Sequence, residues 1–201
     1  MWIVRHAPTQ ANDPGSAKVR GWLDSPVDES GYKLADERAQ HFMDIPLQRI
    51  QYSPVERSRV MAEAIQMYSG VQTMEPDYRL MSWNMGDFQG QDLDDVADSI
   101  DAYMRETPRI AIPGGESYVQ FLSRLLPYIR ESADQDELVC VTHFRDIVAV
   151  AAWDAAGRDG ITQDPDVLSD IGPYDDWQIV LVTPDSFIPM VKDAVTSQGG
   201  S

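Results

Sequence analysis

Apolar runs alternate with amphipathic segments along most of the chain, a pattern typical of an α/β fold. Four apolar runs predict strands, at residues 1–5, 50–52, 138–141 and 179–182. The run Leu-Val-Cys-Val at 138–141 is apolar without interruption. A strand in a parallel sheet reads this way because helices cover both of its faces. The pattern therefore favours a largely parallel sheet.

Amphipathic stretches predict the helices that connect these strands. Asp28 is the expected N-cap of a helix that extends to about Phe42. The tetrapeptide at 53–56, Ser-Pro-Val-Glu, predicts a second helix start, with Ser53 as the cap and the helix extending to about Tyr68. The other expected helices cover residues 92–104, 118–129 and 146–156.

The length of 201 residues fits one compact domain, expected over residues 1–192. The end of the chain, residues 193–201, is rich in Gly and Ser and is expected to be a flexible tail. Residues 71–90 and 158–176 lack a regular period and read as irregular. Hydrophobic residues make up 43% of the chain, enough to bury a core, which argues against a disordered or fibrous protein.

The chain carries 16 basic and 33 acidic residues, a net charge of −17. Nucleic acids and anionic membranes are bound by basic faces, so this balance argues against both as partners. The lone Cys140 excludes an intramolecular disulfide and a Cys-rich metal site. The apolar N-terminal run is too short for a signal peptide or a membrane span, so we expect a cytoplasmic protein. The expected partner is a small molecule, and the chain is expected to be a monomer or a homodimer.

Two of the three histidines directly follow predicted strands. Val-Arg-His at 4–6 closes the first strand, and Val-Thr-His at 141–143 closes the strand predicted at 138–141. Ligands of α/β sheets bind beyond the carboxyl ends of parallel strands, so the two imidazoles are expected to meet there if these strands are neighbours. Arg5 adjoins His6, and Arg57 lies in the first turns of a helix that follows a strand. A helix N-terminus with a guanidinium binds anions.

Three other interpretations of these side chains stay open. Each histidine alone can be a structural residue at a strand end, and Arg57 can be a surface residue. A metal site at His6 and His143 is a rival, because imidazole is a common ligand. No cluster of His, Asp and Glu surrounds either histidine at ligand spacing, and the nearby arginines repel a cation. We therefore predict no metal and no cofactor.

Several stretches resemble, in order and spacing, the motifs of the histidine phosphatase (phosphoglycerate mutase-like) superfamily. Residues 4–9, Val-Arg-His-Ala-Pro-Thr, resemble its Arg-His-Gly-x-Thr signature, and residues 141–143, Val-Thr-His, resemble its second-histidine motif. The other matching stretches are residues 20–27, Gly31, 53–63, 86–90 and 113–117. The resemblance covers residues 1–150 and implies a three-layer α/β/α sandwich with a mostly parallel central sheet.

The resemblance also implies roles for individual residues. His6 is expected to be the nucleophile of a phosphohistidine mechanism, and Arg5, Arg57 and His143 are expected to form the phosphate pocket. Residues expected to contribute to substrate binding are Thr9, Asn12, Arg20 and Arg145. Arg145 follows His143 by two positions, where the family commonly has small residues, and is expected either to bind a second anionic substituent or to face solvent. The implied activity is a metal-independent phosphomonoesterase acting on small phosphorylated metabolites.

One departure from the family pattern concerns the proton donor. Members usually have a Glu just before the Gly-x-Trp-x-Gly block, and Ser82 stands at that position here. Serine is a poor general acid, and general acid assistance is worth about 10²–10⁴-fold in rate. Asp87 is the nearest candidate for a substitute acid. The alternatives are therefore a weak phosphatase, an impaired member that binds a phosphorylated ligand, and a phosphoglycerate mutase.

Overall fold

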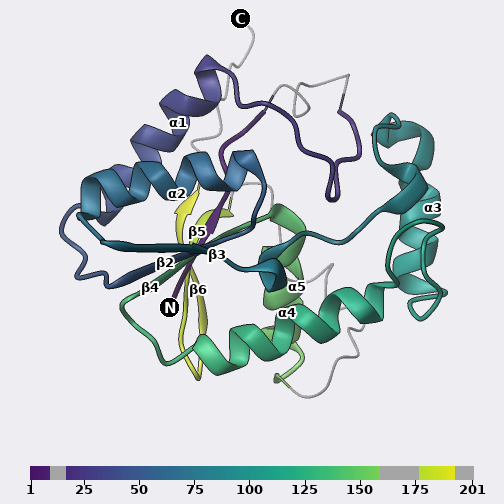
Figure 1. Cartoon of the computed structure of the whole chain (residues 1–201). Helices are drawn as coiled ribbons and strands as arrows, with labels where there is room; N and C mark the ends of the chain where they lie inside the picture. Colours follow the sequence, from purple (N-terminus) through teal and green to yellow (C-terminus); the bar gives the residue numbers. More distant parts are fainter. Residues whose placement is uncertain (10–16, 159–176, 193–201) are drawn as a thin grey trace, which may run out of the picture.

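The computed structural model describes residues 1–9, 17–158 and 177–192. Its centre is a six-stranded sheet in the order β3-β2-β4-β1-β5-β6 (Figure 1). The strands are β1 (Trp2–Arg5), β2 (Arg49–Tyr52), β3 (Thr73–Pro76), β4 (Leu138–Thr142), β5 (Trp177–Val182) and β6 (Phe187–Lys192). The first four pair in parallel, and β5 and β6 pair antiparallel at one side. The expected mostly parallel sheet is confirmed.

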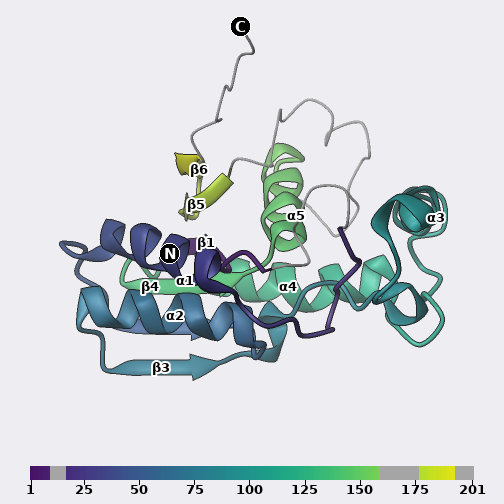
Figure 2. The same ribbon diagram turned by 90° about the horizontal axis from the view of Figure 1, so that it is seen from above.

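Helices cover both faces of the sheet and make three layers. Their bounds are α1 (Glu29–Ala39), α2 (Glu56–Ser69), α3 (Leu93–Arg105), α4 (Tyr118–Ser132) and α5 (Phe144–Ala155). Short 3-10 turns are η2 (Gln40–Phe42), η3 (Tyr78–Leu80) and η4 (Gly86–Phe88). Helices α1 and α2 lie on one face of the sheet and α4 and α5 on the other, while α3 lies beyond its end (Figures 1 and 2). None of the described helices combines the length and apolarity needed to cross a membrane.

Strand β4 shows why the layers form. All five of its residues are buried. Successive side chains of a strand point to opposite faces. Leu138 and Cys140 pack into the core beneath α4 and α5, and Val139 and Val141 pack into the core beneath α1 and α2. The uninterrupted apolar run thus supplies both cores, and each fully buried aliphatic side chain stabilises the fold by about 1.5–3 kcal/mol.

Most predicted elements are present, and one predicted cap is wrong. Asp28 caps α1 by accepting a hydrogen bond from the Gly31 amide at 2.9 Å. Ser53 does not cap α2, because α2 begins at Glu56 with Val55 at the cap position and no side-chain cap bond. The Ser53 hydroxyl contacts a histidine instead.

Two strands were not predicted. β3 lies inside the stretch expected to be irregular, and β6 lies beyond the last predicted strand. β3 is an edge strand with largely exposed side chains, so it has no apolar run to mark it. The loop expected at 158–176, apart from residue 158, and the tail at 193–201 lie outside the described residues.

The register of β1 and β4 positions the candidate site. Arg5 is the partner of Thr142 in the parallel ladder, so both strands end at the same edge of the sheet. The next residues along the chain are His6 and His143. The His6 amide donates a hydrogen bond to the Thr142 carbonyl at 2.8 Å, which continues the ladder to the histidine itself. The two imidazoles therefore enter the same space beyond the sheet.

Candidate active site

The two strand-end histidines lie side by side. The ring centroids of His6 and His143 are 5.0 Å apart, and each residue is 3% exposed. The predicted meeting of residues 137 positions apart in the sequence is thus present in the structure. The third histidine, His41, packs against Trp2 and Phe42 away from this pair.

A backbone hydrogen bond fixes the tautomer of His6. Its Nδ1 lies 2.5 Å from the Ala7 carbonyl oxygen. A carbonyl only accepts, so Nδ1 carries the proton and the neutral ring keeps Nε2 free of one. Burial lowers the pKa of His6 well below 6.5, and the neighbouring His143, Arg20 and Arg57 lower it further. His6 is therefore neutral at pH 7, with an unprotonated Nε2.

Hydrogen bonds orient the ring of His143 in a similar way. Its Nε2 lies 2.8 Å from the Ser53 hydroxyl, and its Nδ1 lies 3.5 Å from Nη2 of Arg57. A guanidinium only donates, so Nδ1 accepts and Nε2–H donates to Ser53. Burial, and then the charge of Arg57, lowers the pKa of His143 well below 6.5. Ser53 is thus a positioning residue that the helix-cap interpretation of the sequence missed.

Arg57 is fixed by the loop that covers it. The residue is 1% exposed and lies in the first turn of α2. Its Nη2 donates to the Gly21 carbonyl at 2.9 Å, and its Nη1 donates to the Leu23 carbonyl at 3.0 Å and lies 3.5 Å from Oδ1 of Asp24. Burial lowers its pKa to about 10, against the opposing effect of Asp24. The guanidinium stays charged at pH 7 in a fixed orientation.

Gly21 allows the loop to approach Arg57 this closely. Its φ is +52°, a conformation that favours glycine. A Cβ at this position would lie 2.7 Å from the Gln89 side chain and 2.9 Å from the Met85 amide. The glycine was part of a family-like stretch in the sequence, but its role in holding Arg57 could not be predicted from it.

Arg20 adds a second buried guanidinium. Its Nη1 donates to the Thr9 hydroxyl at 3.0 Å, so these two predicted binding residues lie together. The pKa of Arg20 is lowered to about 9. Burial is the largest cause, and the charges of Arg57 and Arg5 contribute after it. Arg5 itself is half-buried with its guanidinium 5.0 Å from the centre of the Phe144 ring. Positive groups held this close together favour an anion between them.

A cavity of about 190 Å³ lies beside the two histidines, Arg20 and Arg57. Its described lining residues are His6, Lys18, Val19, Arg20, Gly21, Arg57, Ser82, Met85, Leu93, Ile100, His143, Phe144 and Arg145. None of these is a carboxylate, which favours an anionic ligand over a cation.

Three predicted site residues that the structure describes, Arg5, Thr9 and Asp87, are absent from the described lining of this cavity. Asp87 is exposed in the turn η4, and its amide donates to the Pro113 carbonyl at 2.8 Å. Asn12 lies outside the described residues.

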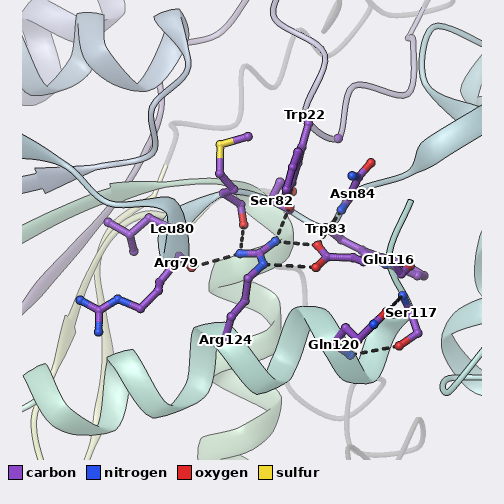
Figure 3. A network of polar contacts seen from close by, with 12 residues as sticks. Trp22, Arg79, Leu80, Ser82, Trp83, Asn84, Glu116, Ser117, Gln120 and Arg124 are labelled. Carbon is purple, nitrogen blue, oxygen red and sulfur yellow. Dashed lines mark hydrogen bonds and ion pairs between the residues drawn. The ribbon is translucent and has the colours of Figure 1, made fainter. Parts of the chain in front are cut away.

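Ser82 lines the cavity, and its backbone is fixed from behind (Figure 3). Its carbonyl accepts hydrogen bonds from Nη2 of Arg124 and from Nε1 of Trp22, both at 2.7 Å. Arg124 also donates to the Met81 carbonyl and pairs with Glu116 at 2.7 Å. The backbone at Ser82, where the family resemblance leads us to expect an acid, is therefore fixed by these hydrogen bonds. Neither Trp22 nor Arg124 was singled out from the sequence.

Comparisons with known proteins identify the family. A model of the histidine phosphatase superfamily (branch 1) matches residues 1–159. A curated relative from Cronobacter sakazakii (strain ATCC BAA-894), "Probable phosphoglycerate mutase GpmB", is 30% identical over 129 residues, which cover 62% of this chain and 59% of that protein. The chain thus spans about three fifths of the length of the curated relatives it matches.

Solved structures show a similar fold. A mycobacterial glucosyl-3-phosphoglycerate phosphatase is 25% identical with a TM-score of 0.63, over 78% of this chain and 79% of that one. The structure of Bacillus stearothermophilus YhfR is 24% identical with a TM-score of 0.72, over 97% and 96% of the two chains. The second likeness concerns the fold alone.

Proposed function

Because this chain belongs to the histidine phosphatase superfamily, we propose that it is a metal-independent phosphomonoesterase that acts through a phosphohistidine at His6. The observation that carries this proposal is the pairing of His6 with His143, 5.0 Å apart, in a cavity that holds two buried guanidiniums and no described carboxylate. Such a cavity is complementary to the charge that spreads over the oxygens of a transferring phosphoryl group.

The first step forms a bond between Nε2 of His6 and phosphorus. The ester P–O bond breaks, and its electron pair leaves with the alcohol oxygen, which then takes up a proton. The Ala7 carbonyl accepts the hydrogen bond from Nδ1–H and stabilises the positive ring of the intermediate. The guanidiniums of Arg57 and Arg20 stabilise the negative charge on the phosphoryl oxygens.

The second step releases phosphate. A water oxygen bonds to phosphorus, the N–P bond breaks, and its electron pair returns to Nε2 of His6. Both protons of the water stay with the phosphate or its surroundings, so His6 is again neutral with Nδ1–H. If the hydroxyl of a second substrate replaces water, the same intermediate gives a mutase, and curated relatives carry that name.

The described cavity wall offers no side-chain acid to protonate the leaving alcohol oxygen. No described carboxyl lines the cavity, and Ser82 lines it at the position where the family resemblance leads us to expect an acid. We therefore infer a preference for esters whose alcohol is a good leaving group. The same observation favours a second candidate function, a phosphate-ligand binder with little turnover.

The test measures phosphate release from an aryl phosphate in the presence of a chelator. The proposal expects turnover that His6→Ala abolishes and Arg57→Met lowers by about 10²–10³-fold, as for loss of a donor to a transition-state oxyanion. The matched control is Arg59→Met, on the same helix, because Arg59 is exposed and pairs with Glu63 at 2.6 Å. This variant is expected to retain activity.

Other outcomes select the alternatives. Thermal stabilisation by phosphate esters without turnover would support the binder. Isomerisation of a phosphoglycerate that depends on a bisphosphate primer would support the mutase. Turnover that survives His6→Ala would contradict the proposal.

A further inference from the structure

The loop over residues 20–24 lines the cavity and also holds the buried guanidinium of Arg57. We infer that Gln89, which is absent from the described cavity wall, is a positioning residue that fixes this loop and through it orients Arg57. The inference rests on the proposed function, because it assigns a residue that acts on one of the proposed phosphate-binding groups.

The side-chain oxygen of Gln89 accepts hydrogen bonds from two consecutive amides of the loop. Its Oε1 lies 2.6 Å from the Trp22 amide nitrogen and 3.1 Å from the Leu23 amide nitrogen. Two N–H donors require an oxygen acceptor, so this end of the carboxamide faces the loop. Gln89 is itself partly buried and follows the turn η4, where its amide donates to the Gly86 carbonyl at 3.0 Å.

A single peptide group connects Gln89 with Arg57. The Trp22 amide and the Gly21 carbonyl belong to one planar trans peptide group, whose N–H and C=O point in opposite directions. The N–H donates to Gln89, and the C=O accepts from Nη2 of Arg57 at 2.9 Å. Hydrogen bonds in such a chain polarise one another. The acceptor on Gln89 therefore strengthens the bond that holds Arg57, besides fixing its direction.

The second carbonyl that holds Arg57 depends less on Gln89. Leu23 accepts from Nη1 of Arg57 at 3.0 Å through its carbonyl. Its amide is shared between Gln89 and the Arg20 carbonyl, the latter at 2.8 Å. Loss of the Gln89 side chain is therefore expected to loosen the bond to the Gly21 carbonyl most.

Backbone pairing next to the loop does not involve the Gln89 side chain. The Val19 amide donates to the Gln91 carbonyl at 3.0 Å, and the Gly90 amide donates to the Val19 carbonyl at 2.8 Å. These bonds stay in place when the side chain of residue 89 is shortened. A substitution of Gln89 thus changes the local direction of the loop rather than the fold.

Arg20, the other guanidinium on this loop, has its own anchor. Its Nη1 donates to the Thr9 hydroxyl at 3.0 Å, a bond in which Gln89 takes no part. The influence of Gln89 on the cavity is therefore expected to pass through Arg57.

The experiment is a double-mutant cycle of Gln89→Ala and Arg57→Met, with kcat/KM for an aryl phosphate as the measured quantity. Effects of two residues that act through one contact are not additive. We expect Gln89→Ala to lower kcat/KM roughly 10-fold in the unmodified chain but less than about 2-fold in the Arg57→Met background. Gln89→Glu keeps an oxygen acceptor and is expected to restore activity to within about 3-fold of the unmodified chain.

Gln91→Ala is the matched control. Gln91 is exposed, lies two positions further along the chain and donates from its side chain to the Asp87 carbonyl at 2.6 Å. This variant is expected to retain full activity. Unchanged activity in Gln89→Ala, or an equal loss with and without Arg57, would overturn the inference while leaving the phosphatase proposal intact.

A second measurement does not depend on turnover. In a chain labelled with 15N-arginine, a fixed guanidinium gives separate NMR signals for Nη1 and Nη2, and a rotating one gives an averaged signal. The signals of Arg57 are identified by their loss in Arg57→Met. We expect separate signals in the unmodified chain and in Gln89→Glu, and an averaged signal in Gln89→Ala.

The two measurements separate the two proposals. If aryl phosphates are not turned over, the phosphatase proposal fails and the NMR signals still decide the role of Gln89. Separate Arg57 signals in Gln89→Ala, or an averaged signal in the unmodified chain, would overturn that role.

Discussion

Nε2 of His143 lies 2.8 Å from the hydroxyl of Ser53, and this hydrogen bond links the end of β4 to the residue that follows β2. Both residues are buried. The bond turns Nδ1 of His143 toward Arg57, and hence toward the cavity. Because the Ser53 hydroxyl is bonded to His143, it does not cap α2, and Val55 stands at the cap position without a side-chain cap bond.

Replacing Ser53 tests this link. Ser53→Ala is expected to lower kcat/KM by roughly 5- to 20-fold, the equivalent of one lost hydrogen bond of about 1–1.5 kcal/mol. The reason is that the ring of His143 loses the acceptor that orients it. Steady-state kinetics with an aryl phosphate provide the measurement. Ser58→Ala is the control, because Ser58 is also buried on α2 but its hydroxyl has no hydrogen-bond partner among the described residues. Equal losses in both variants would contradict a specific role of Ser53.

Restoring an acid at position 82 is expected to raise activity toward unactivated esters. Ser82 lines the cavity and its backbone is fixed by Arg124 and Trp22, so a longer side chain at 82 extends into the cavity. Ser82→Glu is expected to raise kcat/KM for an alkyl phosphate by at least ~10-fold, within the 10²–10⁴-fold that general acids supply. The dependence of rate on leaving-group pKa should become shallower.

Two variants accompany that measurement. Ser82→Gln has nearly the same shape without a transferable proton and is expected to give no gain. Asp87→Asn is expected to turn over alkyl phosphates like the unmodified chain, since Asp87 is exposed outside the described cavity wall. Equal rates in Ser82→Glu and Ser82→Gln would show that protonation of the leaving group does not limit this enzyme.

The buried carboxyl of Asp146 makes stability depend on pH. Burial raises its pKa to about 8, with nearby Arg124 lowering it and Glu116 raising it by less. The folded chain keeps a proton that the unfolded chain releases above about pH 4. Stability is therefore present below that pH and is lost as pH rises toward 8. Asp146→Asn removes this cost, so its Tm should exceed that of the unmodified chain more at pH 8 than at pH 5. A difference independent of pH would contradict the account.

The two site histidines have the opposite effect. Both pKa values are lowered well below 6.5, chiefly by burial. As the pH falls below 6.5, these histidines are therefore protonated in the unfolded chain while they stay neutral in the folded chain. Their contribution to stability is present above pH 6.5 and is lost as pH falls below it. A variant with His6→Asn and His143→Asn should lose less unfolding free energy between pH 7.5 and pH 5 than the unmodified chain. Urea unfolding at the two pH values measures this, and equal losses would contradict neutral histidines.

The part of the site that lies at the ends of strands could be predicted from the sequence. His6 and His143 each follow an apolar run, and parallel strands bring such residues to one edge. Ser53 was misassigned because a serine before Pro-x-Glu reads as a helix cap, and the competing bond to His143 comes from a residue 90 positions away. Strand β3 was missed because an exposed edge strand has no apolar period. The hydrogen bond from Arg124 to the Ser82 carbonyl joins a side chain to a distant backbone group. No local sequence pattern predicts such a contact.

The most direct test of the central claim is the chemical identity of the trapped intermediate. The protein is mixed with a large excess of aryl phosphate, quenched in alkali, where phosphohistidine survives, and analysed by peptide mass spectrometry. The account predicts one phosphoryl group, on Nε2 of His6, that is absent in His6→Ala. A phosphoryl group on any other residue, or turnover without one on His6, would contradict it.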